Sequence, residues 1–166
     1  MIKIGDVVFV QNKGICKVEN IAKNAFVGAD KTKEYFVFKP VDVSNNMMVY
    51  FPTDTKATMR KLSSKTQVKS LIDDFGELEE IKIASEDERF SKYAEITQKG
   101  NLEDWCRLLK TLAVRKSKIQ KKQFNIQEQK YINTLLSCVL AEMSYVNGED
   151  KDAIKDKLSQ NLDIAL

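Results

Sequence analysis

The sequence predicts an α+β protein: a small antiparallel β-barrel of the Tudor or SH3 type, followed by an all-α helical domain. Short apolar runs with a two-residue period fill the first part of the chain, as is typical of strands. After Leu62 the apolar period changes to about 3.6 residues, which is typical of helices. Apolar residues make up 43% of the 166 residues, enough for two modest cores. We therefore expect domains over residues 1–62 and 63–166.

The first two strands are expected to form a hairpin. Residues 4–10 are mostly β-branched or aromatic, and Gly5 and Asp6 offer a turn near their start. Residues 12–14 predict a tight turn because their glycine accepts a positive φ. Residues 15–21 then alternate apolar and polar side chains, as a half-buried strand does.

Further strands are expected over residues 34–38 and 47–52, which are rich in aromatic and β-branched side chains. Asn45 and Asn46 predict a turn before the second of these strands. Four or five short antiparallel strands in about 60 residues favour a small closed barrel.

The first predicted helix covers residues 66–75, where apolar side chains share one face and Gly76 marks the end. Residues 77–85 leave helix and loop equally open. Residues 85–88 have the form of a capping box, in which a serine and a glutamate satisfy backbone N–H groups at a helix start. A second helix is therefore expected from this segment to Gly100.

Two asparagines predict the starts of the next helices. Asn101 precedes an apolar stripe with acidic residues in its first turn, where the helix dipole favours negative charge. Asn125 is followed three residues later by Glu128, again in capping-box form, and this fourth helix is expected to end near Gly148. A last helix is expected over residues 151–162.

The composition argues against most enzyme classes. The chain has no histidine, which removes the commonest general base and the commonest zinc ligand. Cys16, Cys106 and Cys138 are odd in number and far apart, so we expect reduced thiols rather than disulfides or a metal site. The N-terminus lacks a signal-peptide pattern, and no apolar run is long enough to span a membrane. We expect a cytoplasmic, non-catalytic protein without a cofactor.

Basic residues are concentrated in one part of the predicted helical domain. Seven lie between positions 107 and 122 with no acidic residue among them: Arg107, Lys110, Arg115, Lys116, Lys118, Lys121 and Lys122. Lys130 follows on the next helix. Such a run can neutralise the phosphates of a nucleic acid, but cations are also favourable at the C-terminal end of any helix. Both interpretations stay open.

Two aromatic features also allow two interpretations. Trp105 lies at a helical spacing that favours core packing over ligand binding. Tyr50, Phe51 and Pro52 close a strand and either belong to the barrel core or form an exposed edge that pairs with another protein's sheet.

The first domain resembles the CarD family and the polymerase-interacting module of transcription-repair coupling factors. The resemblance rests, in order, on residues 4–10, Gly14, residues 18–21, 34–38 and 49–52, and Met59 with Arg60. The second domain resembles the helical domain of CarD proteins in Arg89, Gly100, Asn101, Leu109, Leu112, Arg115, Glu128 and residues 140–142. No helicase motif accompanies them, which excludes a complete coupling factor.

The resemblance implies a bacterial transcription regulator that docks on the β subunit of RNA polymerase through a sheet edge. Asn24 and Tyr50 fall where family members place basic polymerase contacts, so the docking chemistry differs here. We expect Asn24, Tyr50, Phe51 and Pro52 to take part in docking.

The resemblance also implies that the helical domain contacts promoter DNA, at phosphates and the minor groove, with little sequence specificity. The expected DNA contacts are Arg89, Phe90, Lys110, Arg115, Lys116, Lys118, Lys121, Lys122 and Lys130. Several family members insert a tryptophan at the edge of the transcription bubble. Glu86 matches that position here, and Phe90 is the nearest aromatic residue.

Two alternatives to a DNA-binding regulator remain. The first is a protein–protein adaptor on the polymerase whose basic helices meet an acidic partner. The second is an enzyme that uses lysine and carboxylate groups, which a deep pocket converging on a buried pair would indicate. We expect a monomer, although exposed edge strands could allow domain swapping.

Overall fold

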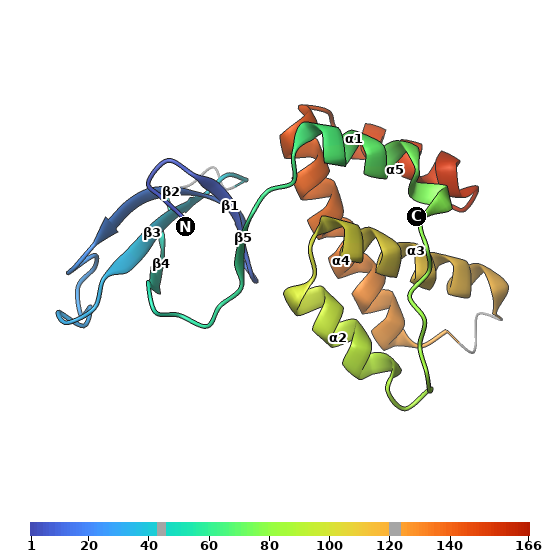
Figure 1. Ribbon diagram of the computed structural model, residues 1–166, viewed down its shortest axis with the longest axis horizontal. Helices are drawn as coiled ribbons and strands as arrows, with labels where there is room; N and C mark the ends of the chain where they lie inside the picture. Colours follow the sequence, from blue (N-terminus) through green and yellow to red (C-terminus); the bar gives the residue numbers. More distant parts are fainter. Residues whose placement is uncertain (43–45, 120–123) are drawn as a thin grey trace. The chain divides into compact units, whose positions relative to one another are not determined.

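The computed structural model describes residues 1–42, 46–119 and 124–166. Two compact units make up the chain, Met1–Leu62 and Ser63–Leu166 (Figure 1). They divide where the apolar period changes from about two residues to about 3.6.

The first unit is an antiparallel sheet of five strands. The strands are β1 (Val7–Val10), β2 (Gly14–Ala22), β3 (Tyr35–Pro40), β4 (Val49–Pro52) and β5 (Met59–Lys61). Their order in the sheet is β4-β3-β2-β1-β5. The predicted hairpin of β1 and β2 is present, with Asn12 and Gly14 at positive φ in its turn. Asn45, from the predicted turn before β4, lies outside the described residues.

The α+β class is confirmed, but the predicted closed barrel is not. Within residues 1–42 and 46–62, β4 and β5 are the two edges of the sheet and form no ladder with each other. Closing a sheet requires a continuous hydrogen-bonded ladder between its edges. Strands of four and three residues offer little backbone for such a ladder.

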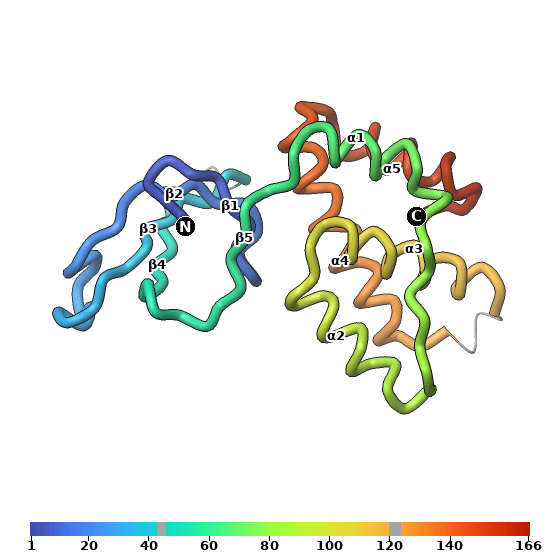
Figure 2. The backbone as a smooth tube through the Cα atoms, in the orientation of Figure 1, coloured from blue at the N-terminus to red at the C-terminus, as the bar shows by residue number. Residues whose placement is uncertain are grey.

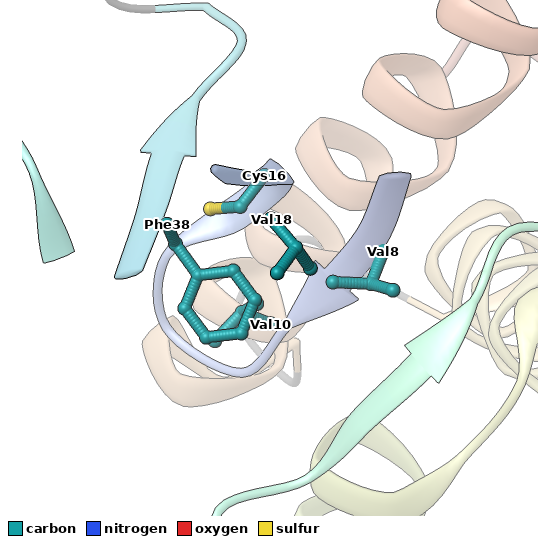
Figure 3. Close-up of a cluster of buried hydrophobic side chains, with 5 residues drawn as sticks. All are labelled: Val8, Val10, Cys16, Val18 and Phe38. Atoms are coloured by element: carbon teal, nitrogen blue, oxygen red, sulfur yellow. The ribbon is translucent and has the colours of Figure 1, made fainter. Parts of the chain in front are cut away.

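The core of the sheet lies on one of its faces. Side chains from β1, β2 and β3 converge there and are fully buried: Val8, Val10, Cys16, Val18 and Phe38 (Figure 3). Half-buried apolar residues surround this group, among them Val49 and Phe51 of β4. Side chains alternate between the two faces of a strand, so Tyr50 belongs to the opposite face.

The second unit is helical. Its elements are α1 (Lys65–Asp73), the 3₁₀ turn η1 (Phe75–Glu77), α2 (Arg89–Lys99), α3 (Leu102–Lys118), α4 (Ile126–Asn147) and α5 (Lys151–Leu162). Helix α3 packs on α4, and α1 packs on both α4 and α5. The backbone trace shows the irregular segment that leads from η1 to the start of α2 (Figure 2). Trp105 is buried in this unit, and its indole N–H donates to the Ile96 carbonyl at 3.1 Å.

Three helices begin with a capping box. Asn101 and Asn125 cap α3 and α4 as predicted, and Ser64 caps α1. The predicted helix at Ser85 starts later, at Arg89, because residues 86–88 form a turn. The Ser85 hydroxyl accepts the Glu88 N–H at 3.3 Å within that turn. In the described parts of the chain, no helix is both long and apolar enough to cross a membrane.

Candidate interaction surfaces

The outer edge of β4 exposes the backbone of Tyr50. The Thr53 N–H donates to the Glu34 carbonyl at 2.9 Å, and the β3–β4 register continues this ladder. Backbone groups of an antiparallel strand alternate between facing the partner and facing away. Phe51 and Thr53 therefore face β3, whereas Tyr50 and Pro52 face outward.

Proline limits how far this edge can be extended. Pro52 has no backbone N–H, and its carbonyl already accepts the Thr55 N–H at 3.0 Å. Within β4, which is described in full, Tyr50 is thus the residue whose N–H and C=O both face an added strand.

The other edge of the sheet, β5, is better protected. The Gln11 N–H donates to the Thr58 carbonyl at 3.0 Å, so the same alternation turns the backbones of Met59 and Lys61 outward. The Lys61 carbonyl accepts the Arg60 guanidinium at 3.3 Å. Lysine side chains on an edge also oppose pairing with another strand. Of the two edges, β4 is the one without a lysine, and we therefore consider it the more favourable edge for a partner strand.

The four predicted polymerase contacts have different surroundings. Phe51 packs toward the core, with its ring 6.2 Å from that of Phe38. Tyr50 lies on the other face, and Pro52 is half-buried at the end of the strand. Asn24 is exposed in the turn after β2, at a φ of 52° that asparagine tolerates better than most residues.

Sequence reasoning missed one residue of this surface, Phe26. Its ring lies 5.0 Å from the Tyr50 ring and 5.2 Å from the Tyr35 ring. It comes from the polar segment between β2 and β3. The apolar pair Phe26-Val27 within that segment was the signal that could have indicated it.

Two of the predicted DNA contacts, Arg89 and Arg115, share one buried carboxylate. The Arg115 Nε donates to Glu128 Oε1 at 2.8 Å, and the Arg89 Nε lies 3.6 Å from the same oxygen. Glu128 has no exposed surface, and the Arg89 side chain is 12% exposed. The second oxygen of Glu128 accepts the Asn125 N–H at 3.1 Å as part of the α4 capping box. This network joins α2, α3 and α4.

An aromatic cluster adjoins this network. The Phe90 ring lies 5.9 Å from the Tyr93 ring and 6.4 Å from the Tyr131 ring. Tyr93 is fully buried, and its hydroxyl has no hydrogen-bond partner among the described residues. Burial, reinforced by the negative charge of Glu128, raises the Tyr93 pKa to about 12. Phe90, which was predicted to contact DNA, is half-buried against these rings.

Lys110 also has partners inside the helical unit. Its ammonium group donates to the Gly76 and Leu78 carbonyls, each at 2.6 Å. Arg107, from the same basic run, donates through Nε to the Glu79 carbonyl at 2.9 Å. Both side chains tie α3 to the segment after α1.

Lys116, Lys118 and Lys130 are exposed on α3 and α4. The Lys116 ammonium group donates to the Gln129 side chain at 2.8 Å and lies 5.9 Å from the centre of the Phe124 ring. Lys121 and Lys122 lie outside the described residues.

An acidic turn precedes α2. Glu86, Asp87 and Glu88 are exposed there, and Glu86 forms an ion pair with Arg89. Three exposed carboxylates repel phosphates, so this turn opposes close approach to a nucleic acid.

Surface hollows on the helical unit are shallow and charged. One of about 450 Å³ lies between residues 79–82, α2 and the start of α3, lined by acidic and basic side chains alike. Within the described residues, no group of three His, Cys, Asp or Glu side chains could hold a metal ion.

Comparison with protein families identifies the sheet unit. Residues 2–63 match the family model described as CarD-like/TRCF RID domain. The first unit is a CarD-like RID domain. RID domains interact with RNA polymerase, so the chain is a transcription-related protein with that enzyme as a partner. Comparison with curated proteins found no match.

The RID domain and the helical unit differ in charge. The RID domain, residues 1–62, carries 10 basic and 6 acidic residues, a formal net charge of +4. The helical unit, which lies beyond the family match, carries 17 basic and 18 acidic residues, a net charge of −1. The basic run of α3 is therefore a local feature of a helical unit that is slightly acidic as a whole.

Proposed function

We propose that this protein is a bacterial, non-catalytic transcription regulator. Its RID domain binds the β subunit of RNA polymerase, and its helical unit contacts promoter DNA and alters the stability of the open complex. The observation that carries this proposal is the match to the RID domain, together with the position of β4 at an edge of the sheet formed by the described strands. We further propose that the protein acts in the cytoplasm, where its partner acts, and that it does so as a monomer.

Polymerase docking is proposed at β4 by addition of a strand. Unpaired backbone groups on an edge strand are the usual acceptors of an extended segment from another protein. Tyr50 supplies these groups. Pro52, which has no N–H, ends the part of the edge that can pair, and Phe51 holds β4 on the core of the sheet. Asn24 adds a polar contact from the turn after β2.

DNA contact is proposed at the exposed lysines of α3 and α4. Lys116, Lys118 and Lys130 are exposed and form no buried ion pair with the residues that the structure describes, and Lys121 and Lys122 lie between them in the sequence. The contacts of Arg89, Lys110 and Arg115 favour a supporting role, because these cations hold the helices that present the lysines. Because the Phe90 side chain is half-buried, we propose that it also stabilises the helices rather than contacting DNA.

The mechanism is thermodynamic linkage. A protein that contacts polymerase and the open promoter more favourably than the closed promoter shifts the equilibrium by the difference in binding free energy. A difference of about 1.4 kcal/mol changes the ratio of open to closed complexes tenfold. No covalent chemistry is required of the chain.

An adaptor that binds polymerase without DNA is the second candidate function. The net charge of −1 on the helical unit and the acidic turn before α2 favour it. The adaptor predicts no salt-sensitive DNA contribution to binding.

Open-complex lifetime on the cognate polymerase distinguishes the two candidates. We compare the intact chain with a triple variant in which Lys116, Lys118 and Lys130 become alanine. A matched control changes Lys65, Lys69 and Lys151, which are exposed elsewhere on the helical unit. The regulator predicts that the intact chain and the control alter the lifetime and the first variant does not. If the open-complex lifetime with each of these three proteins equals the lifetime with polymerase alone, the adaptor is favoured.

Docking at β4 is tested by comparing Tyr50→Ala with Tyr50→Pro. Both variants remove the ring, but only proline removes the outward N–H, and neither change breaks the ladder to β3. We expect Tyr50→Pro to bind polymerase more weakly than Tyr50→Ala. Equal binding by the two variants would argue against strand addition at this edge.

A further inference from the structure

We propose that Phe26 and Tyr50 together select the docking strand, which is an extended polymerase segment with an apolar side chain next to Tyr50. The inference rests on the proposed docking at β4 and adds the side-chain chemistry that the partner must have.

The backbone of β4 offers too little contact to select a partner alone. Tyr50 is the β4 residue that presents both an N–H and a C=O outward, and Pro52 ends the edge. In strand addition, main-chain hydrogen bonds hold any extended segment, and side-chain pockets supply the specificity. Side chains beside Tyr50 therefore decide which segment binds.

Phe26 is the side chain placed to make this selection. Its ring packs against those of Tyr35 and Tyr50, with centroid distances of 5.2 Å and 5.0 Å, and the residue remains 39% exposed. Tyr35 and Tyr50 lie on the face of the sheet opposite the core, so this cluster is separate from the core cluster of Figure 3. Val27, next to Phe26, is fully exposed.

Local hydrogen bonds hold the segment that carries Phe26. The Ala29 N–H donates to the Phe26 carbonyl at 3.1 Å, and Gly28 takes a positive φ of 89° in this turn. The Asp30 N–H donates to the Tyr35 hydroxyl at 3.2 Å, which fixes the segment to β3. The apolar site thus exists before a partner arrives, which lowers the entropic cost of binding.

The exposed groups define the occupant. Only an extended backbone can pair with Tyr50, and the Phe26, Val27 and Tyr50 side chains provide aromatic and aliphatic surface. Lys33 and Asp54, from the segments next to β3 and β4, form an ion pair with each other at 3.1 Å, so neither charge requires a charged partner. The family match makes RNA polymerase the source of that strand. A second copy of this chain is the competing occupant.

The test titrates the 166-residue chain against purified core RNA polymerase of the same organism. We expect Phe26→Ala to weaken binding about tenfold or more, as truncation of a central interface aromatic does. Phe26→Leu, which keeps an apolar side chain, is expected to bind within about threefold of the unchanged protein. Tyr145→Ala is the matched control, because Tyr145 is 44% exposed on the helical unit.

Val27→Glu tests the same site without touching the fold, since the Val27 side chain is fully exposed. A charge beside the apolar site is expected to weaken binding about fivefold or more. If Phe26→Ala and Val27→Glu bind like the unchanged protein, the inference is overturned while polymerase docking stands. If the unchanged protein does not bind, the proposed function itself fails. A dimer that Phe26→Ala dissociates would assign the edge to a second copy instead and overturn the inference.

Discussion

Glu128 illustrates how one buried carboxylate determines the role of two arginines. It accepts a hydrogen bond from Arg115, lies beside Arg89 and completes the cap of α4. A buried charge is tolerated only when other charges and hydrogen bonds compensate its lost hydration. Removing this charge leaves two cations without their shared partner.

Glu128→Gln should destabilise the helical unit by about 3 kcal/mol, because breaking a buried ion pair strands the remaining charges. Urea unfolding followed by the fluorescence of Trp105, the one tryptophan in the chain, measures this loss. Glu95→Gln is the control, since Glu95 pairs with Lys92 at an exposed site and should cost less than about 1 kcal/mol. Equal losses in the two variants would contradict the role assigned to Glu128.

Tyr93→Phe should leave stability at pH 8 unchanged or raise it by up to about 1 kcal/mol. The change removes a buried hydroxyl that has no hydrogen-bond partner among the described residues. Because folding raises the Tyr93 pKa from 10.0 to about 12, the unchanged protein should lose stability as the pH rises from 10 toward 12. Urea unfolding at pH 8 and pH 11 should show a smaller alkaline loss in the variant. A parallel pH dependence would exclude Tyr93 as its cause.

The contacts of Glu128 could be predicted from the sequence only in part. The capping role of Glu128 was visible because it depends on residues three positions apart. Its pairing with Arg89 and Arg115 was not, since three helices must pack before those side chains meet. Within the described part of the basic run, Arg107, Lys110 and Arg115 bind groups inside the helical unit, so the sequence overstated how much of their positive charge is available to a partner.

The start of a helix could be predicted where a capping side chain binds a backbone N–H of the same first turn. It was less predictable where the same side chain can bind an N–H within a turn that precedes the helix. Asn101 and Asn125 begin helices as predicted. Ser85 satisfies an N–H within a turn, and α2 begins at Arg89 without a side-chain cap. The sequence left an exposed edge at Tyr50, Phe51 and Pro52 as one of two interpretations, because the order of strands in a sheet depends on pairing between distant segments.

Gly76→Ala should destabilise the helical unit by about 2–3 kcal/mol. A Cβ at this position would lie 2.1 Å from the backbone oxygen of Asn161, so α5 must move away from α1 and η1. Urea unfolding monitored by circular dichroism measures the loss. Gly148→Ala is the control, because that site is open and only the positive φ of 71° is strained, at about 1 kcal/mol. A smaller loss at Gly76 than at Gly148 would contradict the close packing of α5.

For the whole molecule, the distribution of charge sets how binding should respond to salt. The RID domain carries +4 and the helical unit −1, so the proposed DNA contribution would depend on a few exposed lysines. Each phosphate contact adds about 0.9 to the slope of log affinity against log salt concentration. The boundary between the two units could be predicted, because it is close to the change of apolar period in the sequence. The net charge of the helical unit was not apparent from the basic run, because acidic residues far outside that run offset it.

Replacing Lys116, Lys118 and Lys130 with alanine should reduce the magnitude of that slope by about 2–3 units. Fluorescence anisotropy with a promoter duplex, repeated from about 50 to 200 mM salt, measures it. The control triple at Lys65, Lys69 and Lys151 should leave the slope unchanged. If both triples lower it equally, diffuse charge rather than a defined surface explains the binding.

The connection between the two units is very short. Strand β5 ends at Lys61 and the cap of α1 is Ser64, while the Ser63 N–H donates to the buried carboxylate of Glu142 at 2.8 Å. Three residue steps span at most roughly 11 Å of extended chain. Once the RID domain is anchored on polymerase, the helical unit cannot diffuse away, so under the proposed function it would meet nearby DNA at an effective concentration in the millimolar range. A DNA affinity too weak to measure with the free protein can then suffice on the assembled promoter.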